Sequence, residues 1–239
     1  MIPKSLKTFV PKPLIDKYHR WSIYREYQGY RKTPGHTYNR FDATKSIFIH
    51  IPKAGGISVI KSLYGNKAGG IGHRTYKHFQ WIYGERAFNE YYKFTFVRNP
   101  YDRLLSAYSF LKKGGMNHID RRFNEEILSQ YKTFEEFVMK GLTEKHVSDL
   151  EVWTHFYPQT RFIYDENDNL AVDFVGRFES FNEDYEKIRQ KIGSGEKLKH
   201  LNKTKDKKAK DYKEAYTAEM REKTAEIYRK DLELLGYDF

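Results

Sequence analysis

The chain has 239 residues, which is long enough for one α/β domain with a sizeable core. Of these residues 39% are hydrophobic and 17% aromatic, a composition that is too apolar for a disordered chain. Its 43 Lys and Arg against 32 Asp and Glu give a formal charge of +11. This charge suits nucleic acid, an anionic membrane, a nucleotide or an acidic glycan, or simply a well-solvated surface. The absence of cysteine excludes disulfides, thiolate catalysis and cysteine-based zinc sites, and it fits a reducing compartment.

The first part of the chain predicts an arm, a helix and a buried strand. Residues 1–12 indicate an extended arm, and the spacing of apolar residues over 14–28 predicts a helix that ends near Gly29. A short β-branched run over 46–51, stopped by Pro52, predicts a buried strand, with a helix over 58–63 and a glycine-rich loop over 65–72 after it. No apolar run is long enough for a signal peptide or a membrane span, so we expect a soluble cytoplasmic protein.

A second strand, over 93–97, is followed by a helix over 101–112. Two successive strand–loop–helix units predict an α/β fold with a parallel sheet that binds ligands at the carboxyl ends of its strands. The remaining pattern predicts helices over 133–140, 149–157 and 181–192, strands over 161–164 and 173–178, a lysine-rich surface loop over 203–213 and a last helix over about 212–235.

The loop after the first strand has the composition of an anion-binding turn. Unpaired N–H groups at a helix start attract anions, Gly55 and Gly56 allow close backbone approach, Lys53 adds charge and Ser58 adds a hydroxyl. By itself this segment fits an ordinary tight turn equally well. Lysine precedes the glycines, opposite to the order in the nucleotide triphosphatase loop, which removes the main support for a kinase or GTPase.

A second group follows the second strand. Arg98 at the strand end and Ser106 on the next helix could converge on one phosphate, the arginine through a forked pair of donors and the serine through its hydroxyl. The alternative is that Arg98 pairs with Asp102 and that Ser106 only packs.

Together the two segments resemble the donor-binding motifs of carbohydrate sulfotransferases of the bacterial and Golgi type, such as heparan 2-O-sulfotransferase, over about residues 45–238. The resemblance implies the donor 3′-phosphoadenosine 5′-phosphosulfate and a three-layer P-loop-like fold, with a central parallel sheet flanked by helices, over 45–239 after an arm and helix over 1–44. It assigns the 5′-phosphosulfate to a loop whose residues are Lys53, Ala54, Gly55, Gly56, Ile57 and Ser58. Ala54 and Ile57 replace family threonines, so backbone N–H groups and Ser58 must bind more of the donor.

The same resemblance assigns the 3′-phosphate to Arg98 and Ser106 and places a catalytic base in the segment from Gly72 to Tyr76. It also implies a basic lid over the donor, whose residues are Asn202, Lys203, Thr204 and Lys208. A solvated surface is the alternative for that charge run.

Sulfuryl transfer resembles phosphoryl transfer, an in-line displacement with charge building on the leaving oxygen. We expect Lys53 to stabilise that charge and His73 to accept the proton of the attacking hydroxyl, with His78 as the second candidate. We expect no metal ion. The acceptor would be a glycan or glycolipid, and neither its identity nor the oligomeric state is readable. His155 and Gln159, one helical turn apart, are as consistent with a structural as with an acceptor-binding role.

Two other functions remain open from the sequence. A basic nucleic-acid-binding protein would use the +11 charge and the 20 tyrosines, but no helix-turn-helix, zinc-finger or aromatic ribonucleoprotein signature is evident, so no nucleic-acid partner is expected. The replacements at Ala54 and Ile57 also fit a degenerate family member that binds the nucleotide without turnover.

Overall fold

The computed structural model describes residues 11–65, 70–148, 153–198 and 211–239. Its described strands form one parallel sheet in the order β1 (Ser46–Ile49), β2 (Tyr92–Val97) and β3 (Phe174–Arg177). The registers pair Ile49 with Thr95 and Val97 with Arg177. All three carboxyl ends therefore reach the same edge of the sheet. The two predicted strand–loop–helix units are confirmed.

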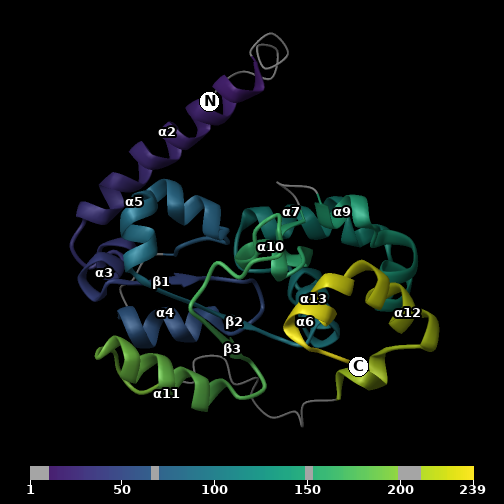
Figure 1. Ribbon diagram of the computed structural model, residues 1–239. Helices are drawn as coiled ribbons and strands as arrows, with labels where there is room; N and C mark the ends of the chain where they lie inside the picture. Colours follow the sequence, from purple (N-terminus) through teal and green to yellow (C-terminus); the bar gives the residue numbers. More distant parts are fainter. Residues whose placement is uncertain (1–10, 66–69, 149–152, 199–210) are drawn as a thin grey trace.

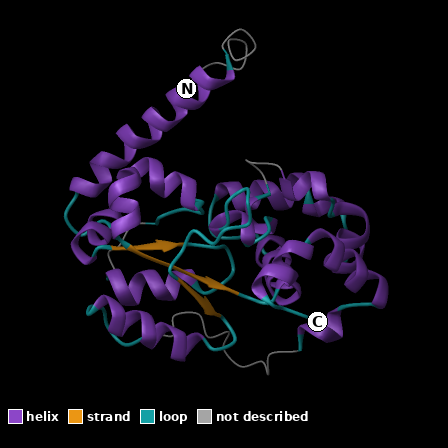
Figure 2. Ribbon diagram, viewed as in Figure 1, coloured by secondary structure: helices purple, strands orange, loops and turns teal. Residues whose placement is uncertain are grey.

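Helices surround this small sheet (Figures 1 and 2). In Figure 1 the strands lie between α3 (Thr37–Thr44) and α5 (Tyr76–Glu90) on one side and α4 (Gly56–Tyr64) and α11 (Phe181–Ile192) on the other. The other α-helices are α2 (Lys12–Lys32), α6 (Pro100–Lys112), α7 (His118–Glu126), α8 (Phe134–Glu136), α9 (Glu144–Ser148), α10 (Thr160–Ile163), α12 (Ala218–Ile227) and α13 (Arg229–Leu235). Short 3-10 turns cover Leu128–Gln130, Thr154–Phe156 and Tyr212–Ala215, and a π-helical turn covers Phe137–Gly141.

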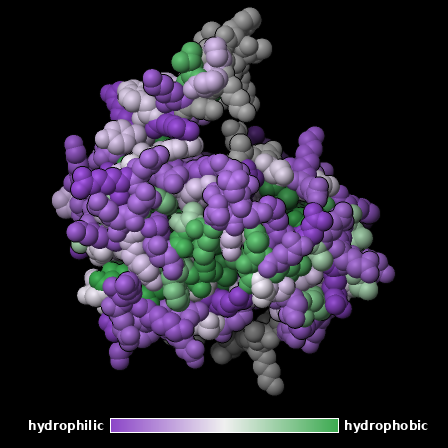
Figure 3. Space-filling model, viewed as in Figure 1, coloured by the Kyte–Doolittle hydropathy of each residue, from purple (hydrophilic) through white to green (hydrophobic). Residues whose placement is uncertain are grey.

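The core is largely aromatic. Phe48, Phe94 and Phe96 of the strands are at most 1% exposed, and they pack in the same cluster as Tyr38 and Phe41 of α3. Burying such large side chains supplies most of the stabilisation of a chain whose surface is mainly hydrophilic on the face shown in Figure 3. The predicted division of the chain into an arm and helix over 1–44 and a domain over 45–239 stays a prediction.

Several local predictions are wrong, each for a tertiary reason. Helix α2 passes Gly29 because Gln28 and Arg31 donate hydrogen bonds to the carbonyl of Ile82 on α5, which offsets the helix cost of a glycine. Of the segment over 161–164, predicted as a strand, residues 161–163 belong to helix α10, since Asp231 accepts the backbone N–H and the hydroxyl of Thr160 at its start, and Tyr164 makes only an isolated antiparallel bridge to Leu170.

The predicted last helix is also broken. Thr217 caps α12 by accepting the N–H of Met220, and Tyr228, with φ −105° and ψ 24°, separates α12 from α13. Within the predicted helix over 149–157, residues 149–152 lie outside the described ranges, and the rest holds only the 3-10 turn Thr154–Phe156. Helices α3, α5, α7 and α9 have no counterpart among the elements predicted from the sequence.

Among the described residues, no helix combines the length and the apolar character needed to cross a bilayer.

Candidate functional site

The segments that follow the three strands meet at the carboxyl edge of the sheet. The loop after β1 contains Lys53, β2 is followed by Arg98, and β3 is followed by Phe178. The guanidinium carbon of Arg98 lies 4.2 Å from the ring centre of Phe178, and a guanidinium nitrogen donates to the carbonyl of Lys53 at 3.2 Å. The two cations predicted from the sequence therefore belong to one site.

The loop after β1 turns sharply into α4. Lys53 has a left-handed φ of 67° and Gly55 a φ of 82°. A left-handed lysine is strained, and such strain is most common at functional sites. A Cβ at Gly55 would come within 2.7 Å of the Phe181 ring, and one at Gly56 within 2.0 Å of the His50 ring. Both glycines are thus required by close packing.

Helix α4 begins without help from a capping side chain among the described residues. Its first N–H groups and the positive end of its dipole therefore remain available to an anion. Ser58, in the first turn, is 9% exposed, and Ile57 is half-buried. Ala54 is 1% exposed and its methyl group belongs to the core, so only its backbone could meet a ligand.

The ammonium group of Lys53 lies 3.8 Å from the centre of the Phe110 ring, a cation–π arrangement. Burial and the neighbouring Arg98 lower the pKa of Lys53 to about 8, while Asp120 acts in the opposite direction. A lysine in these surroundings gains from a bound anion, because the anion would restore the stabilisation that water gives an exposed ammonium.

Arg98 is held by Asp102, as the alternative interpretation of the sequence proposed. Nε and one terminal nitrogen of Arg98 lie 2.6 and 2.7 Å from the two oxygens of Asp102. With the bond to the Lys53 carbonyl, three of its N–H groups are engaged. A guanidinium has five, so within the described part of the chain two remain for a ligand and the group is fixed in orientation.

Ser106 lies between these two cations along α6. Asp102, Ser106 and Phe110 are spaced by four residues and share one face of the helix. Asp102 pairs with Arg98 and Phe110 lies under Lys53, which places the Ser106 position between them. Ser106 is half-buried.

The backbone of Arg98 is fixed by Gln159. The Gln159 side chain accepts the N–H of Arg98 at 2.9 Å and donates to its carbonyl at 2.8 Å. Gln159 is itself 0% exposed, and its own N–H bonds to the buried Asp231 at 2.8 Å. Of the two roles left open for Gln159, the structural one is confirmed.

Three histidines lie beside Lys53. The ring centres of His50 and His73 are 4.6 Å apart, and those of His73 and His155 are 5.4 Å apart. Nδ1 of His73 lies 3.2 Å from the carbonyl of His50. Because a carbonyl only accepts, Nδ1 carries the hydrogen and Nε2 keeps its lone pair. Burial and then the other two histidines hold the pKa of His73 well below its usual value.

His78, the second candidate base, lies in different surroundings. Its Nδ1 is 2.8 Å from the Thr75 hydroxyl, and its ring centre is 5.1 Å from that of Trp81. Burial lowers its pKa to about 4. The four residues of the predicted lid, Asn202, Lys203, Thr204 and Lys208, lie outside the described residues.

Sequence reasoning missed His50 and Asp120 as members of the site. Nε2 of His155 lies 3.3 Å from a carboxylate oxygen of Asp120, 35 residues earlier in the chain. No spacing rule connects these two residues, whereas His50 could have been suspected from its place directly after a buried strand. No group of three or more His, Cys, Asp or Glu within the described ranges is arranged to hold a metal ion.

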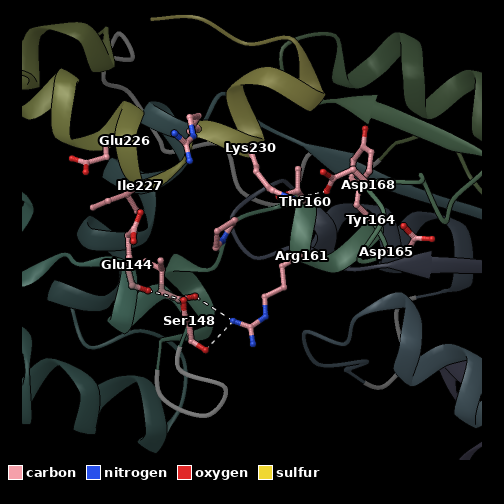
Figure 4. Close-up of a pocket in the computed structure, with 13 residues that line it drawn as sticks. Glu144, Ser148, Thr160, Arg161, Tyr164, Asp165, Asp168, Glu226, Ile227 and Lys230 are labelled. Atoms are coloured by element: carbon pink, nitrogen blue, oxygen red, sulfur yellow. Dashed lines mark hydrogen bonds and ion pairs between the residues drawn. The ribbon is translucent and has the colours of Figure 1, made fainter.

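A separate cavity of about 370 Å³ lies among α9, α10, α12 and α13 (Figure 4). Its lining mixes acids and bases, such as Glu144, Glu226 and Lys230, and Arg161 in its wall donates to the carbonyl of Ser148. Charges of both signs are poorly suited to a polyanion. The carboxyl edge of the sheet is therefore the better candidate site.

Comparison with known proteins agrees with this choice. The model of the sulfotransferase family matches residues 36–238. An uncharacterized protein of Archaeoglobus fulgidus is 30% identical over 115 residues, which are 48% of this chain and 78% of that protein. Carbohydrate sulfotransferase 14 of Danio rerio is 30% identical over 123 residues, 44% of this chain but only 30% of that protein. No solved structure matches the chain. Because the family model covers most of the sequence, the chain belongs to the sulfotransferase family.

Proposed function

We propose that this protein transfers a sulfuryl group from 3′-phosphoadenosine 5′-phosphosulfate to a hydroxyl of a carbohydrate. The observation that supports it best is the meeting of Lys53, Arg98 and the open start of α4 at one edge of a parallel sheet. Two cations and a row of N–H groups fit a ligand with separate 5′ and 3′ anionic ends. The wider proposal is a three-layer P-loop-like fold around this edge.

In this proposal the loop from Lys53 to Ser58 binds the 5′-phosphosulfate, and Arg98 with Ser106 binds the 3′-phosphate. Asp102 holds the Arg98 fork in place, and Phe178 covers its face. As the acceptor oxygen bonds to sulfur, the bond from sulfur to the bridging oxygen breaks and negative charge builds on the leaving phosphate. Lys53 stabilises that charge, because an ammonium group in a desolvated site interacts strongly with it.

His73 is the proposed base. Its Nδ1–H is directed to the His50 carbonyl, which leaves Nε2 able to accept the proton of the acceptor hydroxyl. Its low pKa keeps the ring neutral at pH 7, the state that a base requires. His78 is the less suitable candidate because its contacts are with Thr75 and Trp81 rather than with the histidines beside Lys53.

A carbohydrate acceptor, either a free glycan or a glycolipid, is supported by the likeness to the Danio rerio protein named a carbohydrate sulfotransferase. The test is transfer of labelled sulfur from the donor to a panel of glycans. Label on a glycan with the wild type and none with Lys53→Ala would support the proposal. Tight binding of adenosine 3′,5′-bisphosphate without transfer to any acceptor would instead indicate a nucleotide binder without turnover.

A further inference from the structure

Asp120 is the carboxylate nearest to the histidines of the site. Its side chain is 8% exposed, and its oxygens contact Nε2 of His155 at 3.3 Å and the N–H of Met116 at 2.9 Å. The chain folds closely over it, since a Cβ at Gly115, where φ is 62°, would lie 2.1 Å from the Cβ of Asp120. A buried carboxylate beside an imidazole requires such tight support.

The hydrogen bond to Asp120 fixes the state of His155. When neutral, His155 donates from Nε2 to the carboxylate, so its Nδ1 carries a lone pair. This Nδ1 is buried and has no hydrogen-bond partner among the described residues. Leaving a buried acceptor unpaired is unfavourable, and native structures generally avoid it unless the group has a task.

The other groups that face His73 are cations or bases. His50 and His155 flank its ring, and Lys53, Arg98 and the buried Arg103 lie around the cluster. Within the described residues these cations and imidazoles oppose a proton on His73, the His50 carbonyl favours it, and Asp120 on α7 is the carboxylate that lies beside the cluster. Burial would raise the pKa of Asp120, but the hydrogen bonds from His155 and from backbone N–H groups lower it overall, so the carboxylate stays ionised at neutral pH.

We propose that Asp120 and His155 form a carboxylate–imidazole pair that compensates the charge of the proton taken up at His73, a role that rests on the proposed function. The acceptor hydroxyl gives its proton to Nε2 of His73 as its oxygen bonds to sulfur. Asp120 keeps its negative charge throughout, and His155 lies between that charge and His73. Both are positioning residues, because they act through the base.

The test compares Asp120→Asn with Asp184→Asn. Asparagine keeps an acceptor for the Met116 N–H but removes the charge. Asp184 is a matched control, since its side chain is 9% exposed and it accepts from Arg177, Ser180 and Lys187 away from the histidines. An opposite charge within about 4–6 Å shifts a pKa by about 1–3 units, and Asp120 acts on His73 from the far side of His155, so loss of Asp120 should lower turnover by up to about tenfold.

The expected pattern for Asp120→Asn has three parts: a lower kcat, an unchanged affinity for adenosine 3′,5′-bisphosphate, and a pKa of His73, followed by NMR through its ring protons, that lies below the wild-type value. This pKa falls because the variant lacks a negative charge that favours the protonated ring. Asp184→Asn should leave both kcat and the pKa of His73 unchanged. His155→Phe, which removes the donor that keeps Asp120 ionised, should reproduce the loss of kcat and serves if Asp120→Asn does not fold.

An unchanged pKa of His73, or an unchanged kcat in both site variants, would overturn the proposal and leave Asp120 as a structural residue of the first turn of α7. If the wild type transfers no sulfur to any acceptor, the proposed function fails. The NMR titration then still decides whether Asp120 compensates a proton in this cluster.

Discussion

The lowered pKa of Lys53 predicts how donor binding depends on pH. With a pKa of about 8, Lys53 is about nine-tenths protonated at pH 7 and about one-tenth protonated at pH 9. The phosphates of adenosine 3′,5′-bisphosphate have finished titrating by then, since their second pKa lies near 6. If Lys53 must be charged to bind this ligand, its Kd should rise about tenfold from pH 7 to pH 9.

The direction of this pH dependence follows from the burial of Lys53. Burial penalises the ammonium form, so the free protein loses the proton of Lys53 at a lower pH than an exposed lysine would. The bound 5′-phosphate favours the charged form, so binding above pH 8 requires uptake of a proton. Lys53→Arg provides the control, because arginine remains protonated throughout this range.

The assay is isothermal titration at several pH values from 7 to 9. The wild type should weaken about tenfold, while Lys53→Arg should show a nearly flat profile whatever its absolute affinity. Lys53→Ala should bind weakly and also with a flat profile. An equal pH dependence in the wild type and in Lys53→Arg would refute the assignment of Lys53 to the 5′-phosphate.

Two further predictions concern the histidines. His73→Ala should lower turnover about 10²- to 10⁴-fold while leaving the affinity for adenosine 3′,5′-bisphosphate intact in the same titration. His78→Ala should keep most of the turnover. The reverse result would make His78 the base. Burial lowers the pKa of His50 and of His78 to about 4 in the folded chain. As the pH falls below 6.5, these two histidines therefore take up protons in the unfolded chain but not in the folded chain. Chemical denaturation should therefore show a loss of about 2 kcal/mol per histidine between pH 7 and pH 5, reduced by about that amount in His78→Gln, and an unchanged loss in that variant would contradict the reasoning.

The parallel sheet and the cations at its carboxyl edge could be predicted from the sequence because their signals are local. The run before Pro52 and the run before Asn99 and Pro100 each read as a buried strand with a loop and helix after it, and Asn99 does cap α6 by accepting the N–H of Tyr101. Parallel strands then bring Lys53 and Arg98 together without further information.

The remaining parts depend on contacts between distant segments. His155 reaches Asp120 only because α7 and the turn before α10 pack around α6, and Gln159 reaches Arg98 across 61 residues. Helix α10 replaces a predicted strand because Asp231, 71 residues later, accepts from Thr160 at its start. A single sequence contains no short-range signal for such pairs.

The central claim is that the carboxyl edge of the sheet binds a nucleotide with a 3′-phosphate, and the most direct measurement compares two ligands in Arg98→Ala. Two N–H groups of Arg98 have no partner among the residues that the structure describes, and the guanidinium has a fixed orientation, so losing it should weaken binding of adenosine 3′,5′-bisphosphate about 10- to 100-fold. Removing Arg98 leaves the carboxylate of Asp102 without its partner, so the double variant Arg98→Ala with Asp102→Asn serves as the control for that effect. Adenosine 5′-phosphosulfate, which lacks the 3′-phosphate, should bind Arg98→Ala nearly as well as the wild type. Equal weakening of both ligands, or no binding of either to the wild type, would contradict the account.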